Sequence, residues 1–69
     1  MATGVIRWFN DTRGYGFIEP HDEESSEPLY VHHTAIVGRG YRSLMPGQNV
    51  RFGVSRRDGH EQAIDVEIL

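Results

Sequence analysis

Cysteine is missing from this chain of 69 residues. Without cysteine there is no disulfide framework and no thiolate zinc site, the usual supports of small secreted domains, so we expect a cytoplasmic protein. No apolar run approaches the roughly 18 residues of a membrane helix. The stretch MATGVIRWFN lacks the apolar centre of a signal peptide. We therefore expect one domain, residues 1–69, with neither an export signal nor a membrane anchor.

The chain contains no lysine, and its positive charges do not outnumber its negative ones. The formal net charge is −3, which argues against a protein that binds polyanions through a broad basic surface. All seven basic residues are arginines. Arginine forks onto phosphate and stacks on flat π-systems, whereas lysine acts as a point charge. A compositional bias toward arginine explains the same pattern, so the charge balance alone leaves the partner open.

The chain also lacks a sustained helical period. Its apolar residues come in short runs rich in Val, Ile, Phe and Tyr, separated by segments typical of turns. These runs are residues 4–9, 14–19, 29–36, 48–54 and 62–69. Only HTAI, residues 33–36, predicts a single helical turn. Five short strands in so small a chain predict an all-β barrel, because closure removes exposed strand edges.

Alternation along two of these strands separates rings from aliphatic side chains. The rings that share a face within each strand are those of Tyr15, Phe17, Tyr30 and His32. The opposite faces carry Ile18, Leu29 and Val31. Later strands offer more apolar residues for the same interior, namely Val50, Phe52, Val54, Ile64 and Val66. We therefore predict an aliphatic interior and rings that face water.

An exposed group of rings on a small protein predicts a contact surface. Arg7 and Arg13 lie close to these rings in the sequence. Nucleobases stack on aromatic side chains and arginines meet phosphates, so the combination favours single-stranded nucleic acid. The alternative is that the rings simply complete the core, as large aromatic residues often do.

The residues around these rings resemble a known family. GVIRWFNDTRGYGFIEP, residues 4–20, is similar to the opening of bacterial cold-shock proteins. Within it RGYGFI resembles their first RNA-binding motif, LYVHHTAI resembles the second, and GYRSLMPGQNVRF resembles the segment that follows. The likeness runs from Gly4 to about Val66.

The resemblance implies a five-stranded antiparallel oligonucleotide-binding barrel, the OB-fold. It also implies a monomer that binds single-stranded RNA and DNA, with a preference for pyrimidine-rich strands. No cofactor and no ATP are expected. A member of this family acts as an RNA chaperone and a regulator of gene expression.

The resemblance further implies which residues bind. Arg7 and Arg13 stand where lysine is more common, and His33 stands where the family often has phenylalanine. Asn10 contacts a base or only stabilises a turn. The stacking positions, with Phe9 beside them, are Trp8, Tyr15, Phe17, Tyr30, His32 and Tyr41.

Trp8 is placed differently by two arguments. Strict alternation puts Trp8 on the same side as Ile6, inside the barrel, whereas the resemblance puts Trp8 outside. A β-bulge near Arg7 or Trp8 would reconcile them, because an extra residue shifts the alternation by one.

The sequence departs from the family pattern in three places. The loop HDEESSEP is longer and more acidic than usual, and either faces solvent or repels phosphate. Pro28 stands where an aspartate commonly contacts a base. The segment DGHEQA replaces a basic Gly-Pro segment, with Arg56 or Arg57 as possible substitutes. These departures predict weaker binding than in a typical member.

Other classes of function have less support. The histidines at 21, 32, 33 and 60 match no zinc spacing, and His32 and His33 point to opposite faces if their strand continues. No nucleophile–base pair stands out, so we expect neither a metal site nor an enzyme. The rival hypothesis is a protein-interaction module on the same barrel, favoured by the low charge and the acidic loop.

Overall fold

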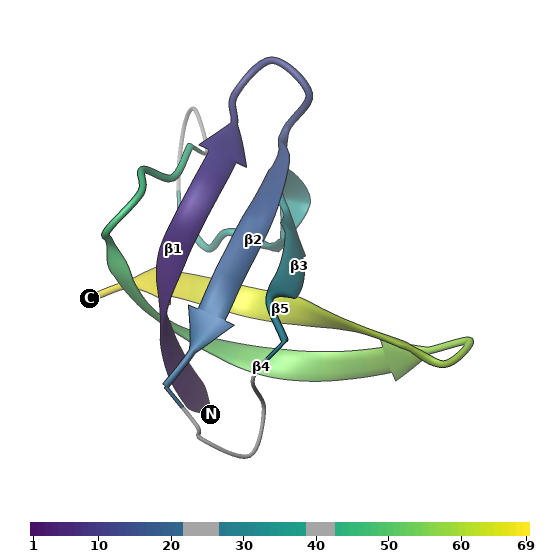
Figure 1. Ribbon diagram of the computed structural model, residues 1–69. Coiled ribbons are helices and arrows are strands. Elements are labelled where there is room, and N and C mark those ends of the chain that lie inside the picture. Colours follow the sequence, from purple (N-terminus) through teal and green to yellow (C-terminus); the bar gives the residue numbers. More distant parts are fainter. Residues whose placement is uncertain (22–26, 39–42) are drawn as a thin grey trace.

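The computed structural model describes residues 1–21, 27–38 and 43–69. The elements in this part of the chain are β1 (Ala2–Asn10), β2 (Tyr15–Pro20), β3 (Leu29–His32), η1 (His33–Ala35), β4 (Asn49–Arg57) and β5 (His60–Ile68). The strands close into a barrel in the order β1-β2-β3-β5-β4 (Figure 1). The structure thus confirms the predicted five-stranded all-β barrel, and the 3-10 helix η1 confirms the predicted helical turn. None of the helical structure described is long and apolar enough to cross a membrane.

The barrel is not purely antiparallel, and that part of the prediction was wrong. Four neighbouring pairs of strands are antiparallel, whereas β3 and β5 pair in parallel at Tyr30 and Gln62. A second parallel bridge joins Ile36 to Val66. The reason is parity: strand direction cannot alternate around a closed ring with an odd number of strands. One parallel seam is therefore unavoidable.

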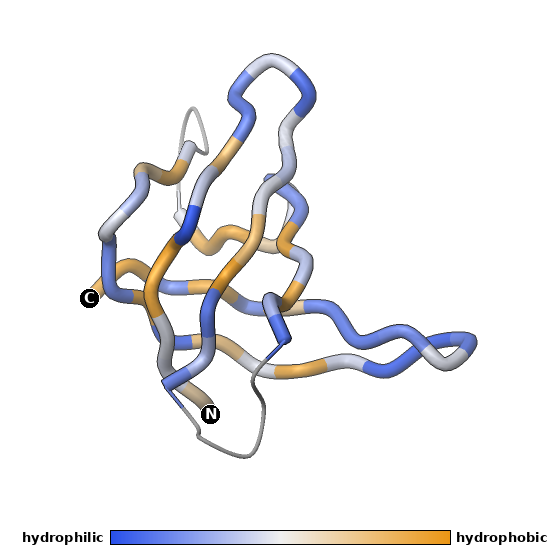
Figure 2. The backbone as a smooth tube through the Cα atoms, viewed as in Figure 1, coloured by the Kyte–Doolittle hydropathy of each residue, from blue (hydrophilic) through white to orange (hydrophobic). Residues whose placement is uncertain are grey.

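The core is built from the aliphatic faces of the strands. Ile18 and Val31 are completely buried, opposite the rings of β2 and β3. Their burial confirms the predicted division of side chains in these strands. The full buried cluster consists of Ile6, Ile18, Leu29, Val31, Ile36, Leu44, Val50, Phe52, Ala63 and Val66. Hydrophobic residues accordingly gather in the body of the barrel, and hydrophilic ones at the tip of the β4–β5 hairpin (Figure 2).

Two residues predicted for the core lie elsewhere. Val54 is 47% exposed and Ile64 is 36% exposed. The register of β4 and β5 shifts between the pairs Arg51–Glu67 and Gly53–Ile64, which gives β5 one extra residue. Asp65, within this shift, has a φ of 50°. Such a bulge reverses the alternation, so Ala63 is buried in place of Ile64.

Val54 is exposed for a different reason. Val54 pairs with Ala63 and lies on the same face of the sheet as Ala63. Val54 is, however, closer to the C-terminal end of β4 than the buried Val50 and Phe52 are. There the β4–β5 hairpin extends beyond the other strands (Figure 1). The inward face of the hairpin therefore has less of the barrel to pack against at Val54.

Truncation at the barrel interior tests this assignment of faces. We expect Ile18→Ala to lower the free energy of unfolding by about 2–5 kcal/mol, because it leaves a cavity in a fully packed core. The measurement is urea-induced unfolding followed by circular dichroism. Phe17→Ala, one residue away on the outer face, is the control and should change stability much less. A larger loss for Phe17→Ala than for Ile18→Ala would show that the two faces are inverted.

Candidate functional site

Six rings lie next to one another on the outer side of β1, β2, β3 and the start of η1, and we call them the ring face. Trp8 is centred 5.5 Å from Tyr15 and 5.4 Å from Phe17. Tyr30 is centred 5.9 Å from Tyr15 and 6.1 Å from Phe17. The members are Trp8, Tyr15, Phe17, Tyr30, His32 and His33. The sequence had predicted all six as binding residues, and the structure brings them into one continuous group.

The strand register produces this arrangement. Phe17 lies opposite Trp8 on one side and opposite Tyr30 on the other. Tyr15 lies opposite His32. Side chains directly opposite one another on neighbouring strands are in contact distance, so three paired strands hold their rings side by side. The rings remain partly accessible, and Trp8 is 42% exposed.

A β-bulge in β1 turns Trp8 outward. Ile6 pairs with Ile18, but Trp8 pairs with Phe17, so β1 advances two residues while β2 advances one. The extra residue shifts the alternation, which leaves Ile6 buried and Trp8 on the ring face. This bulge reconciles the two sequence arguments about Trp8, and it lies between Ile6 and Trp8, near Arg7 as expected.

Gly16 allows β1 and β2 to approach closely behind the rings. A Cβ atom at Gly16 would lie 2.3 Å from the carbonyl oxygen of Trp8 and 2.8 Å from the Cα of Phe9. Both atoms belong to the backbone and cannot swing aside. Phe9 itself is half-buried and packs against the core cluster. Phe9 therefore packs toward the core, and it has no ring contact with the members of the ring face among the described residues.

The two histidines end the row together. β3 stops at His32, whose Nδ1 accepts a hydrogen bond from the backbone N–H of Thr34 at 3.3 Å and lies 2.8 Å from the Thr34 hydroxyl. This cap starts η1, and the chain turns so that the His33 ring is centred 4.4 Å from that of His32. The two side chains point to opposite faces only if the strand continues, and it does not.

Thr34 was not predicted as part of the site. A Ser or Thr two residues after a strand-end histidine is the available sequence signal, because such a residue can close a short capping turn.

Asn10 has a turn role in this structure. Its side-chain Oδ1 accepts a hydrogen bond from the backbone N–H of Arg13 at 3.0 Å. Its backbone carbonyl accepts another from Gly14 at 2.7 Å. Asn10 thus holds the β1–β2 turn, which carries the exposed Arg13 next to the ring-face strands. Of the two roles that the sequence left open for Asn10, the structure shows the turn role.

Three of the five arginines in the described part of the chain form ion pairs, one of them beside the ring face. The ion pairs among the described residues are Arg7–Glu19 at 3.3 Å, Arg51–Glu67 at 2.8 Å and Arg56–Glu61 at 3.3 Å. Arg13 and Arg57 form no ion pair with any of those residues. Glu19 was not predicted as a partner of Arg7, although it shares the parity of the rings at 15 and 17. Tyr41 and most of the acidic loop, residues 22–26, lie outside the described residues.

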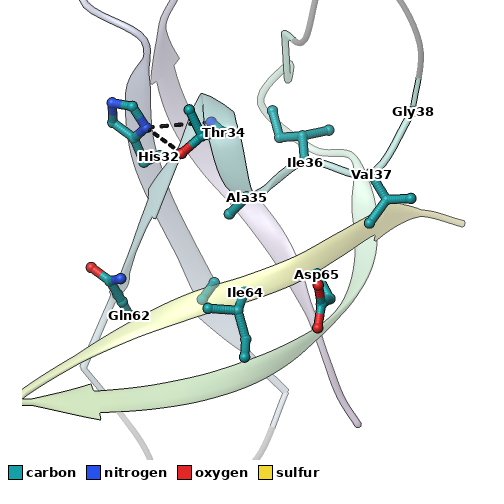
Figure 3. A pocket seen from close by; sticks show the side chains of 10 residues that line it. His32, Thr34, Ala35, Ile36, Val37, Gly38, Gln62, Ile64 and Asp65 are labelled. Atoms are coloured by element: carbon teal, nitrogen blue, oxygen red, sulfur yellow. Dashed lines mark hydrogen bonds between the residues drawn. The ribbon is translucent and has the colours of Figure 1, made fainter.

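A groove of about 460 Å³ continues from the ring face between η1 and β5 (Figure 3). It exists because β3 pairs with β5 only at Tyr30 and Gln62 before the chain meets β5 again at Ile36. His32 and Thr34 border one side of the groove, and β5 residues from Gln62 to Asp65 border the other. No cluster of His, Cys, Asp or Glu suited to a metal ion occurs in the part of the chain that the structure describes.

A closed five-stranded β-barrel with a row of rings across three strands defines a small oligonucleotide-binding type of barrel. The model of the 'Cold-shock' DNA-binding domain matches residues 2–69. The chain belongs to the cold-shock domain family.

Individual relatives agree with this assignment. The chain is 44% identical to cold shock-like protein CspA of Stigmatella aurantiaca, over 100% of this chain and 98% of that protein. It is 42% identical to cold shock protein CapB of Pseudomonas syringae, over 97% of this chain and 93% of that protein. Cold shock protein 1 of Arabidopsis thaliana is 46% identical over 94% of this chain. The chain spans only 21% of that plant protein, and 30% of glycine-rich protein 2 of Nicotiana sylvestris.

Substitution of Gly16 tests the close approach behind the rings. We expect Gly16→Ala to destabilise the protein by at least about 1–3 kcal/mol, the usual cost of overpacking, because the new methyl group meets backbone. Gly53→Ala is the matched control, since its Cβ would first meet a side-chain atom, Cγ1 of Ile64 at 3.2 Å, and no backbone atom closer than 3.7 Å. Urea unfolding of both variants gives the comparison. Equal stability of the two variants would contradict the proposed constraint.

Proposed function

We propose that this protein binds single-stranded RNA and DNA on the ring face, across about 4–7 nucleotides. The observation that carries the proposal is the continuous row of six partly accessible rings on one side of the barrel. Stacking of a base on an aromatic ring contributes about 1–3 kcal/mol and tolerates different bases. The ring face therefore supplies most of the affinity, and membership of the cold-shock domain family supports the same conclusion.

Phosphate contacts have a smaller part in this proposal. Arg13 projects from the β1–β2 turn beside the ring-face strands, and Arg7 adjoins Trp8. Arginine can donate two hydrogen bonds to one phosphate. Because few arginines lie near the rings and the net charge is −3, binding should depend on salt only weakly. We assign Tyr41 to the stacking residues by resemblance alone, and we infer a preference for pyrimidine-rich strands in the same way.

The expected biochemical role follows from mass action. A protein that binds the open form of an RNA shifts the equilibrium away from hairpins without consuming ATP. We propose that it acts in this way as an RNA chaperone and thereby influences gene expression, as a monomer in the cytoplasm.

Trp8 fluorescence tests the proposal directly. Trp8 is the only tryptophan, and it belongs to the ring face. Titration with an oligothymidine should quench its emission strongly, whereas a duplex of the same length should quench it little. Equal responses to both would point to charge and not stacking as the basis of binding.

The second candidate function is a protein-interaction module. Val37, 56% exposed, and Ile64 border the groove between η1 and β5, and they give it apolar side chains (Figure 3). This function becomes the better conclusion if Trp8 fluorescence responds to neither the single strand nor the duplex.

Removal of one ring should weaken binding without unfolding the barrel. We expect Phe17→Ala to reduce affinity for oligothymidine by about 1–3 kcal/mol, the contribution of one stacked base. Phe17 is the central ring, with Trp8 and Tyr30 opposite it on either side. Fluorescence titration measures the affinity, and Val54→Ala, on an exposed residue of β4, is the control. Unchanged affinity in Phe17→Ala would exclude the ring face as the binding surface.

A further inference from the structure

Glu19 occupies an unexpected position for a strand that binds polyanions. In β2, alternation places it on the same side as Tyr15 and Phe17, two residues beyond Phe17. Its Oε2 lies 3.3 Å from Nη1 of Arg7, and the two side chains are 51% and 53% exposed. The carboxylate therefore lies at the border of the ring face and is accessible to solvent.

The strand register shows how Glu19 reaches Arg7. The register runs from Val5–Glu19 and Ile6–Ile18 to Trp8–Phe17, so Arg7 is the residue without a partner across β2. With Ile6 pointing inward and Trp8 outward, the Arg7 side chain emerges on the outer face beside Trp8. From there its guanidinium extends along β2 to Glu19. The bulge thus exposes Trp8 beside Arg7, while Arg7 keeps the outward position that regular alternation would also give it.

We propose that Glu19 competes with nucleic-acid phosphate for Arg7. In the free protein the Arg7 guanidinium is occupied by Glu19, and a phosphate must displace that carboxylate to bind. The exchange replaces one ion pair by another and leaves the Glu19 charge unpaired near the strand. Arg7 then adds little net affinity although it adjoins the rings. This inference rests on the proposed function, because it requires a strand that crosses the ring face.

The competition predicts a specific salt dependence. Each phosphate that is newly neutralised releases counterions and changes the slope of log K against log salt by about −0.7 for single strands. When Arg7 moves from Glu19 to a phosphate, the phosphate releases a counterion but the freed Glu19 carboxylate takes one up. In the wild-type protein the contact at Arg7 therefore changes the salt slope little. Removal of the Glu19 charge should restore the full change of slope.

The test is a double-mutant cycle with Arg7→Gln, Glu19→Gln and the double variant. The probe is an oligothymidine of about seven nucleotides, a length near the top of the proposed site size, titrated at low and high salt against Trp8 fluorescence. Glu19→Gln should tighten binding by about two- to fivefold at low salt, the range of one exposed ion pair, and steepen the salt slope by about 0.7. In the Arg7→Gln background, Glu19→Gln should tighten binding much less.

Glu67→Gln is the matched control. It removes the same charge from a similar ion pair, Arg51–Glu67 at 2.8 Å, on β4 and β5 instead of the ring-face strands. It should leave the affinity for oligothymidine almost unchanged. Thermal unfolding of every variant confirms that each is folded.

The outcomes separate this inference from the proposed function. If Glu19→Gln tightens binding equally with and without Arg7, Glu19 acts only as a repulsive charge and the competition is refuted. If Glu67→Gln also tightens binding of the oligothymidine, the effect is due to net charge, and the competition is refuted in that case too. No change in Glu19→Gln, while the wild type binds, overturns the inference alone. Absence of binding in the wild type and in all variants overturns both, whereas binding only by Glu19→Gln would support the competition.

Discussion

The extra residue in β1 between Ile6 and Trp8 is the constraint on which the rest of the site depends. With regular alternation, a core-facing Ile6 would be followed by an outward Arg7 and an inward Trp8. The barrel would then have to enclose an indole, and the ring face would lose one of the two rings that meet both Tyr15 and Phe17. Because of the bulge, Ile6 before it points into the barrel and Trp8 after it points to the ring face. The strand thus serves the core and the site in succession.

Close approach of the backbones makes the bulge compatible with a tight barrel. Gly16 lies opposite Phe9, where any side chain would meet the β1 backbone. Glycine is therefore required between Tyr15 and Phe17 by the closeness of the β1 backbone, and not by the two rings themselves. It lets β2 lie against the irregular part of β1, and so it holds the rings of both strands at contact distance.

Much of this arrangement could be predicted from the sequence. Alternation in β2 and β3 was sufficient to place Tyr15, Phe17 and Tyr30 outside and Ile18 and Val31 inside. Alternation failed in β5, because Asp65 takes a positive φ within a bulge that no glycine marks. Alternation also left the side of Trp8 undecided, because the bulge in β1 is not marked in the sequence either. The parallel seam between β3 and β5 could have been foreseen, since five strands in a closed ring cannot alternate in direction. The pairing of Arg7 with Glu19 was harder to foresee, because it depends on the register between β1 and β2 and not on the pattern of either strand alone.

The charges of this protein have to be considered by position and not by their sum. Three of its arginines are paired with carboxylates within the described strands, so they neutralise the surface more than they enrich it in positive charge. A surface of this kind attracts nucleic acid weakly from a distance, because steering depends on unpaired charge. It can still hold a strand once bases reach the rings, since stacking does not depend on ionic strength in the way that phosphate contacts do. In the function proposed above, the balance between stacking and phosphate contacts favours accessible, unpaired bases over the phosphate backbone, which duplexes and single strands share.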